Sequence, residues 1–234
     1  MSAQNKKILL VIGGGPAGLM TGLRAGRAGL SVILADEDQL FGGRLNAETT
    51  QIGGMAGDLW VESLVQDLSA LPNVRLMTRT TITGAYDQGT FGALERVSKH
   101  LSSSDKHLPV ECFWRIVAKR SVLTSGALER FIAFPNNDRP GIMSASALRT
   151  YINRYAVAPG RSVAIFANND GAEQTVRELQ AAGVKIVAYV DVRPGAGISG
   201  DFPIYLGAEV CDTFGRLGLE NITVRHAGGE TNIV

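Results

Sequence analysis

The sequence predicts an α/β fold that contains two strand–helix–strand units. In the first unit, an apolar run at residues 7–12 leads into a glycine turn, a helix over 17–28 and a second apolar run over 31–35. The same order of strand, helix and strand is expected over 162–190. Near-continuous aliphatic strands are typical of a parallel sheet that helices cover. We therefore predict a Rossmann-like scaffold of the FAD/NAD(P)-binding kind, with two dinucleotide-binding domains.

The first domain is expected to span residues 1–156. Gly29 ends the first helix, a glycine-rich loop covers 41–57, and a second helix is predicted over 59–71. A strand over 74–78 then extends the sheet. Apolar and polar residues alternate over 80–123, which predicts antiparallel strands interrupted by one polar loop at 102–107.

The second domain is expected to span residues 157–234. A turn-rich crossing at 136–141 and a helix over 144–155 lead to it, and Pro159-Gly160 breaks the chain. We predict a strand over 162–167, a helix over 171–182, a strand over 184–190, a weak helix over 210–217 and a strand over 222–226. In this scaffold the chain normally returns to complete the first domain, so a sequence that stops at Val234 is expected to be truncated at its C-terminus.

The composition argues against several classes of function. The 23 basic and 22 acidic side chains balance, so no overall field draws the chain to nucleic acid or to a membrane. The only cysteines, Cys112 and Cys211, cannot form a Cys-x-x-Cys pair, and the three histidines are scattered, so no metal site is expected. No apolar stretch approaches the ~20 residues that cross a bilayer. A cytoplasmic protein is therefore expected.

A glycine turn carries the functional signal. Gly13, Gly15 and Gly18 have the GxGxxG spacing, and Pro16 and Ala17 open the following helix. The first glycine allows a tight turn, the second lets a pyrophosphate approach the backbone, and the third lets helix and strand pack closely. The helix N-terminus offers free N–H groups to the phosphates.

Acidic residues follow the second strand, where a Rossmann unit binds the adenosine ribose. Asp36 and Glu37 occupy this place, and a carboxylate there accepts the ribose hydroxyls. A carboxylate also repels a 2′-phosphate, and no arginine adjoins these residues in the sequence. NAD or FAD is therefore expected rather than NADP.

Two further segments are candidate cofactor contacts. Gly42-Gly43-Arg44 can bring a guanidinium over the pyrophosphate, or Arg44 can be a solvated arginine on a loop. Thr124-Ser125-Gly126 resembles the Ala-Thr-Gly segment of FAD- and NAD-linked oxidoreductases, although it can equally be a tight turn. The corresponding turn of the second unit, 167–173, lacks GxGxxG and contains Asp170, so a second dinucleotide is not expected there.

Nearly the whole chain resembles the alpha subunit of heterotetrameric sarcosine oxidases. The glycine turn, the acidic pair and Gly42–Leu45 contribute to the resemblance, and the run from Asn136 to Tyr155 is its most specific part. The family's alpha subunit is several times longer, and Phe131 stands where the family usually has proline. The catalytic residues are therefore unknown and can lie outside this chain.

The resemblance implies oxidative demethylation of sarcosine to glycine, with oxygen reduced to peroxide. In that family the alpha subunit binds NAD and contributes to an FMN site at the beta interface, and gamma and delta subunits complete the enzyme. Carried over, the NAD contacts fall on six residues: Ala17, Asp36, Glu37, Asp38, Arg44 and Thr83. Two alternatives remain, namely a subunit of an opine oxidase or other FAD-dependent amine dehydrogenase, and a non-catalytic assembly module with a structural dinucleotide.

Overall fold

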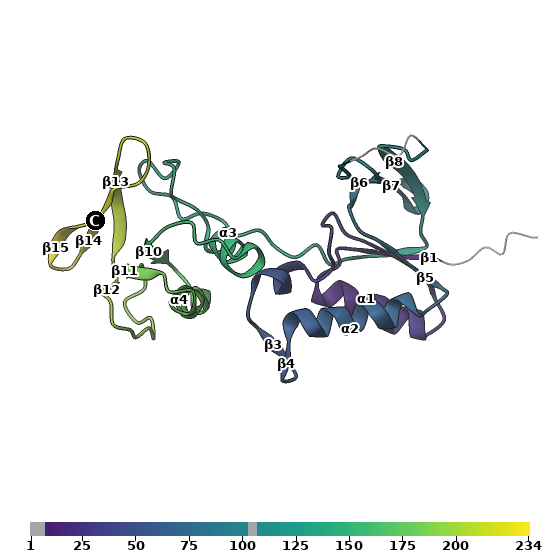
Figure 1. Cartoon of the computed structure of the whole chain (residues 1–234), viewed down its shortest axis with the longest axis horizontal. Helices are drawn as coiled ribbons and strands as arrows, with labels where there is room; N and C mark the ends of the chain where they lie inside the picture. Colours follow the sequence, from purple (N-terminus) through teal and green to yellow (C-terminus); the bar gives the residue numbers. More distant parts are fainter. Residues whose placement is uncertain (1–7, 103–106) are drawn as a thin grey trace, which may run out of the picture. The chain divides into compact units, whose positions relative to one another are not determined.

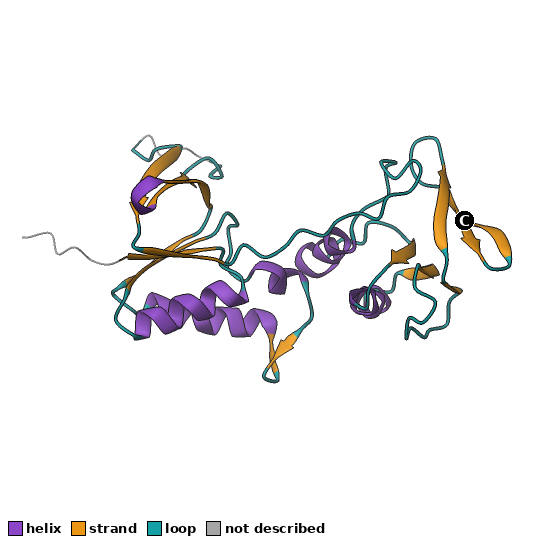
Figure 2. Cartoon of the chain, turned by 180° about the vertical axis from the view of Figure 1, so that it is seen from behind, coloured by secondary structure: helices purple, strands orange, loops and turns teal. Residues whose placement is uncertain are grey.

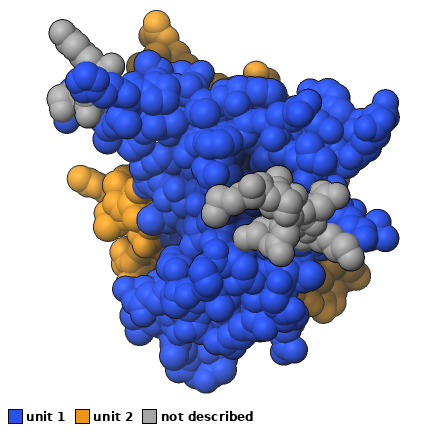
Figure 3. Space-filling view, turned by 90° about the vertical axis from the view of Figure 1, so that its right-hand side faces the viewer, with its two compact units in different colours: residues 1–127 blue, residues 128–234 orange. Residues whose placement is uncertain are grey.

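The computed structural model describes residues 8–102 and 107–234, which divide into two compact units at Ala127/Leu128 (Figure 3). Leu148 is buried with Ile165, Val176 and Leu179, so the segment around it packs in the second unit. The boundary of the compact units thus lies before the expected one at 156/157. The reason is that the apolar face of the short helix around Leu148 is buried by the second strand–helix–strand unit.

The first unit contains a four-stranded parallel sheet with the order β5-β2-β1-β9. Its strands and helices have these bounds: β1 Ile8–Ile12, α1 Pro16–Arg27, β2 Ser31–Ala35, α2 Gly57–Ser69, β5 Val74–Met77 and β9 Arg120–Leu123. A 3-10 helix (Gly43–Ala47) and the short hairpin β3 (Gln51–Ile52) and β4 (Met55–Ala56) precede α2. The predicted strand–helix–strand unit and its extension by β5 are confirmed.

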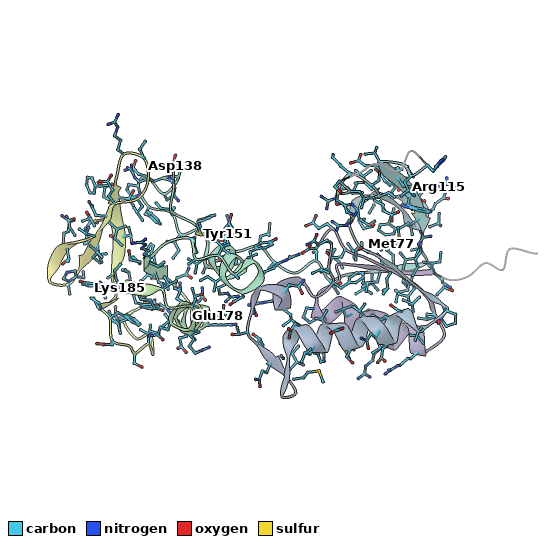
Figure 4. All side chains as sticks on the ribbon, viewed as in Figure 1. Met77, Arg115, Asp138, Tyr151, Glu178 and Lys185 are labelled. Carbon is cyan, nitrogen blue, oxygen red and sulfur yellow. The ribbon has the colours of Figure 1, made fainter. Side chains whose placement is uncertain are left out.

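Helices cover one face of this sheet, and a second sheet covers the other (Figures 1 and 2). Leu19 and Leu23 of α1 and Leu68 of α2 pack against Val32 and Leu34 of β2. On the other face, three strands form an antiparallel sheet: β6 Thr80–Tyr86, β7 Thr90–Arg96 and β8 Glu111–Val117. The two layers enclose the parallel sheet, and Figure 4 labels Met77 at the end of β5 and Arg115 on the antiparallel sheet.

The direction of β9 was wrongly predicted, because we expected an antiparallel strand there. In the structure, β9 runs parallel to β1, with Leu9 opposite Arg120 and Ile12 opposite Leu123. Side chains alternate with a period of two in both kinds of sheet, so the pattern does not reveal strand direction. The antiparallel prediction is confirmed for β6, β7 and β8.

The second unit begins with a short helix and then repeats the α/β pattern. Its helices and strands have these bounds: α3 Ala145–Arg149, a π-helical turn Thr150–Arg154, β10 Ser162–Ala167, α4 Gly171–Ala181, β11 Lys185–Asp191 and β12 Ile204–Leu206. Strands β10 and β11 pair in parallel, as predicted. The structure adds β12, which lies beside β11.

The predicted helix over 210–217 is absent from the described residues, and a strand takes its place. Three antiparallel strands end the chain: β13 Glu209–Phe214, β14 Asn221–His226 and β15 Gly229–Ile233. The register between β13 and β14 shifts between Val210 and Asp212. Because of this bulge, Val210 and Thr213 are both buried although they are three residues apart, which is a helical spacing.

Candidate dinucleotide site

The glycine turn lies between the end of β1 and the start of α1. Gly13 has a φ of +103°, and a Cβ there would lie 2.5 Å from the carbonyl oxygen of Thr124. At Gly18 a Cβ would lie only 1.9 Å from the carbonyl oxygen of Gly13. These two positions therefore require glycine, one for the turn and the other for close packing of helix and strand.

Gly15 differs, because the space where its side chain would be is open. The nearest atom to a Cβ at Gly15 is the Cα of Gly43, at 4.0 Å. Pro16 begins α1, and because the N-cap residue Gly15 has no side chain, no side chain of the N-cap occupies the N–H groups of the first turn. The first N–H groups of a helix have no intrahelical acceptor, so this opening suits an anionic group such as a pyrophosphate.

The segments after β2 and β9 are tied to the glycine turn. The carboxylate of Asp36 accepts hydrogen bonds from Gly14 N, at 2.5 Å, and from Asp38 N, at 2.8 Å. The Thr124 hydroxyl lies 2.8 Å from the carbonyl oxygen of Gly13 and 3.0 Å from that of Ile12. Sequence reasoning singled out Thr124 but missed this link, which depends on β9 lying beside β1.

The loop after β2 continues past the opening at Gly15. Gly42 N donates to the carbonyl oxygen of Gly14 across 2.8 Å, which brings Gly43 against Gly15. Arg44 is exposed, and its Nε lies 2.6 Å from Oε1 of Glu48 in the same loop. Its role at a pyrophosphate stays a prediction.

The remaining predicted contacts lie at different places. Ala17 is exposed in the first turn of α1, and Glu37 is exposed after β2. Gly126 follows β9 with a φ of +70° and open space around it. Thr83 belongs to β6 of the antiparallel sheet, where its Oγ1 lies 3.0 Å from the place of a Cβ on Gly92. The structure thus brings the glycine turn, Asp36 and Gly43 into one site.

Two arginines that the sequence analysis overlooked lie against the loop after β2. Arg79 N donates to the carbonyl oxygen of Asp38, and Arg96 Nη2 donates to that of Glu37, at 2.7 and 2.6 Å. The expectation that no arginine adjoins the acidic residues therefore holds in the sequence but not in space. Pairing of β6 with β7 brings both arginines to this loop.

The corresponding turn of the second unit is occupied by an ion network. The Asp191 carboxylate, fully buried at the end of β11, accepts hydrogen bonds from the Tyr189 hydroxyl and from Arg193. Arg193 also lies 2.7 Å from Asp170 in the turn before α4. Burial tends to raise the pKa of Asp191, but the hydrogen bonds from Arg193 outweigh it and hold that pKa below its ordinary value.

Metal-ligand clusters and membrane-spanning helices are not found in the part of the chain that the structure describes. Residues 8–102 and 107–234 contain no group of three or more histidine, cysteine or acidic residues that could hold a metal. Within the same residues, none of the helices has the length and apolar character needed to span a membrane.

Comparison with known proteins shows what the chain is similar to. Residues 9–118 match the family described as FAD dependent oxidoreductase. The alpha subunit of the sarcosine oxidase of Rhizobium meliloti is 49% identical over 97% of this chain, and the chain spans 23% of that relative. One of the opine oxidase subunits of Agrobacterium tumefaciens is 25% identical over 78% of this chain, which spans 36% of it.

A solved structure supports the fold. The L-proline dehydrogenase of P. horikoshii superimposes with a TM-score of 0.72 at 24% identity, over 97% of this chain and 40% of the other. Together with the family match, this similarity confirms the predicted FAD/NAD(P)-binding α/β scaffold. The fold implies that a flavin or a nicotinamide dinucleotide is bound.

Proposed function

This chain is a homologue of sarcosine oxidase alpha subunits that carries an FAD dependent oxidoreductase domain, and on that premise we propose that it is the NAD-binding portion of such a subunit. In this role it supports the oxidative demethylation of sarcosine to glycine. The observation that carries the proposal is the 49% identity over nearly the whole chain together with an intact glycine turn.

The residues of the first unit suit a dinucleotide. The pyrophosphate would lie at the N-terminus of α1, where Gly15 leaves room and the backbone N–H groups of the first turn can donate. The ribose would lie beside the loop that begins at Asp36. A bound nicotinamide or flavin ring supplies the two-electron acceptor that amine oxidation requires.

NAD is the proposed occupant, and FAD is the alternative. An acidic loop after β2 favours adenosine with a free 2′-hydroxyl, which both molecules contain. The resemblance to sarcosine oxidase alpha subunits implies NAD, whereas the match of residues 9–118 to the FAD dependent oxidoreductases supports FAD. In the proposed enzyme a second flavin, FMN or FAD, lies on a partner subunit or is shared with it.

The proposed partners are subunits of the beta, gamma and delta types. The relative from Rhizobium is itself named as one subunit of an enzyme. Since the chain spans 23% of the Rhizobium relative, the amine-binding and catalytic residues can lie on other parts of the assembly. The proposal therefore assigns cofactor binding, and no catalytic step, to the residues described above.

Bound nucleotide provides the first test. We would record the absorbance spectrum of the purified chain, denature it, and identify the released small molecule by mass spectrometry. NAD released without a flavin band supports the proposal. The proposal would be contradicted if the chain released neither NAD nor FAD after purification and bound neither of them after incubation with each.

Substrate specificity is tested on the assembled enzyme. The chain, within its full-length subunit together with the partner subunits, is assayed for peroxide formation with sarcosine and with other N-methyl amino acids. Oxidation of sarcosine supports the substrate assignment. If none of these amines is oxidised, the assignment fails, even where the chain binds NAD.

Membership of an opine oxidase is the second candidate, favoured by the similarity to the opine oxidase relative from Agrobacterium. A yellow chain that releases FAD, in an assembly that oxidises an opine, would support it.

The ion network at the turn of the second unit instead favours a non-catalytic assembly module with a structural dinucleotide. Reduction of the bound nucleotide by the amine substrate would refute that module.

A further inference from the structure

A pocket lined by four basic residues lies beside the loop that follows β2. It has a volume of about 180 Å³ and is lined by Arg79, Arg96, Lys99 and His100. Thr80 pairs with Glu95 in the antiparallel sheet, so Arg79 and Arg96 are neighbours, with Arg96 N donating to the carbonyl oxygen of Arg79 across 3.0 Å. The fold thus brings Arg79 beside Arg96, to which it is not adjacent in the sequence.

Hydrogen bonds to the loop position the two arginines. Arg79 Nη2 donates to Oε1 of Gln39 across 3.2 Å, and Arg96 Nη2 donates to the carbonyl oxygen of Glu37 across 2.6 Å. Each guanidinium carries five N–H donors in a planar arrangement, so donors remain for a second acceptor. Both arginines are therefore held next to the proposed ribose position and can still bind a ligand.

Backbone donors partly offset the negative charge of the loop. The carboxylate of Asp36 accepts from Gly14 N and Asp38 N, and Asp38 Oδ1 accepts from Gln39 N across 2.6 Å. The pocket lining itself contains no acidic residue among those the structure describes, although Lys99 reaches Glu111 at 3.4 Å. The side chains that line the pocket therefore carry a net positive charge, which favours an anion.

We propose that this pocket binds a phosphate group. A phosphate offers several acceptor oxygens, which match the planar donors of guanidinium groups and the point charge of a lysine. The group can come from inorganic phosphate or from the 2′-phosphate of a dinucleotide, since an arginine near the end of the second strand accommodates a 2′-phosphate in Rossmann units. The site is additional to the dinucleotide function proposed above, which requires no such pocket.

The test measures binding of inorganic phosphate, NAD⁺ and NADP⁺ to the full chain by calorimetry. The pocket variant carries Lys99→Gln and His100→Gln, which leave both arginines and their loop contacts in place. We expect its phosphate affinity to fall about tenfold or more, since a hydrogen bond to a charged group contributes ~1.5–3 kcal/mol. Its affinity for NAD⁺ and its thermal unfolding should remain those of the unmodified chain.

Two matched variants separate pocket charge from other effects. Glu111→Gln breaks the same ion pair as Lys99→Gln but leaves the lysine in the pocket, so phosphate affinity should be retained or raised. Arg24→Gln removes a charge from the last turn of α1, outside the pocket, and should have no effect. Equal losses in all of these variants would contradict a specific site.

The three ligands identify the source of the phosphate. Tighter binding of NADP⁺ than of NAD⁺, lost in the pocket variant, assigns the site to a 2′-phosphate. Binding of inorganic phosphate that the pocket variant loses, with equal affinities for the two dinucleotides, assigns it to free phosphate. If the unmodified chain binds neither phosphate nor NADP⁺ through these residues, the proposal is wrong. Failure to bind NAD⁺ and FAD would instead count against the proposed function, and phosphate binding could still be observed.

Discussion

The carboxylate of Asp36 accepts a hydrogen bond from the backbone N–H of Gly14, which joins the end of β2 to the glycine turn after β1. Its second oxygen accepts from Asp38 N, so one side chain holds both the turn and the loop that borders the ribose position. Asp36 therefore positions the backbone, and its predicted contact with ribose hydroxyls would add to that role.

Replacing Asp36 should weaken dinucleotide binding. We expect Asp36→Ala to reduce affinity by the ~1.5–3 kcal/mol of a charged hydrogen bond. Asp36→Asn should have a smaller effect, because an amide retains one acceptor oxygen for the two backbone donors. Calorimetry measures the affinity of each variant for NAD⁺ and for FAD. Glu37→Gln serves as the comparison, and a larger loss in that variant would move the ribose contact to Glu37.

Two glycine substitutions should separate binding from folding. At Gly15 a Cβ meets no atom closer than 4.0 Å, so Gly15→Ala should leave thermal stability unchanged while the methyl group occupies the proposed pyrophosphate position. At Gly18 a Cβ would lie 1.9 Å from a carbonyl oxygen, so Gly18→Ala should cost at least ~1–3 kcal/mol of stability. Calorimetry measures the dinucleotide affinity and the thermal stability of both variants. Unimpaired dinucleotide binding by the Gly15 variant would place the pyrophosphate elsewhere.

The Thr124 hydroxyl should stabilise the junction of β1 and β9. Thr124→Val removes its hydrogen bond to the carbonyl oxygens of Ile12 and Gly13, and should lower the free energy of unfolding by ~0.5–1.5 kcal/mol. Thr124→Ser retains the hydroxyl and should restore most of the loss. Urea denaturation measures the free energy of unfolding of the unmodified chain and of both variants. Equal stabilities of the threonine and valine forms would show that this link is energetically neutral.

Local spacing predicted much of the site, whereas contacts between distant segments were not predictable. The glycine turn and the acidic residue after β2 are defined by their distance along one strand–helix–strand unit, so the sequence displays them. Arg79 and Arg96 meet the loop at Glu37–Gln39 only through the register of β6 and β7. Likewise, the bulge in β13 gives its buried residues Val210 and Thr213 a helical spacing, so local spacing does not distinguish this strand from a helix.

Acid should destabilise the second unit partly through Asp191. Its pKa lies below the ordinary 3.8 in the folded chain, because hydrogen bonds from Arg193 more than offset the effect of burial. A folded-state pKa below the unfolded value gives stability that is present above the unfolded pKa and is lost as pH falls through the folded pKa. The stability that depends on this carboxylate should therefore decline below about pH 4.

Asp191→Asn isolates that contribution. At neutral pH the variant should be less stable by ~1–3 kcal/mol, because a neutral amide replaces a buried carboxylate that accepts from Tyr189 and Arg193. As pH falls below about 4 the difference should begin to shrink, because Asp191 becomes protonated in the unfolded chain, and it should vanish only below the lower folded-state pKa. Asp170→Asn, which alters the exposed end of the same network, should have a smaller effect. Urea denaturation at pH 7 and pH 3.5 measures the free energy of unfolding of each protein. The linkage would be contradicted if the difference between the Asp191 variant and the unmodified chain did not shrink at the lower pH.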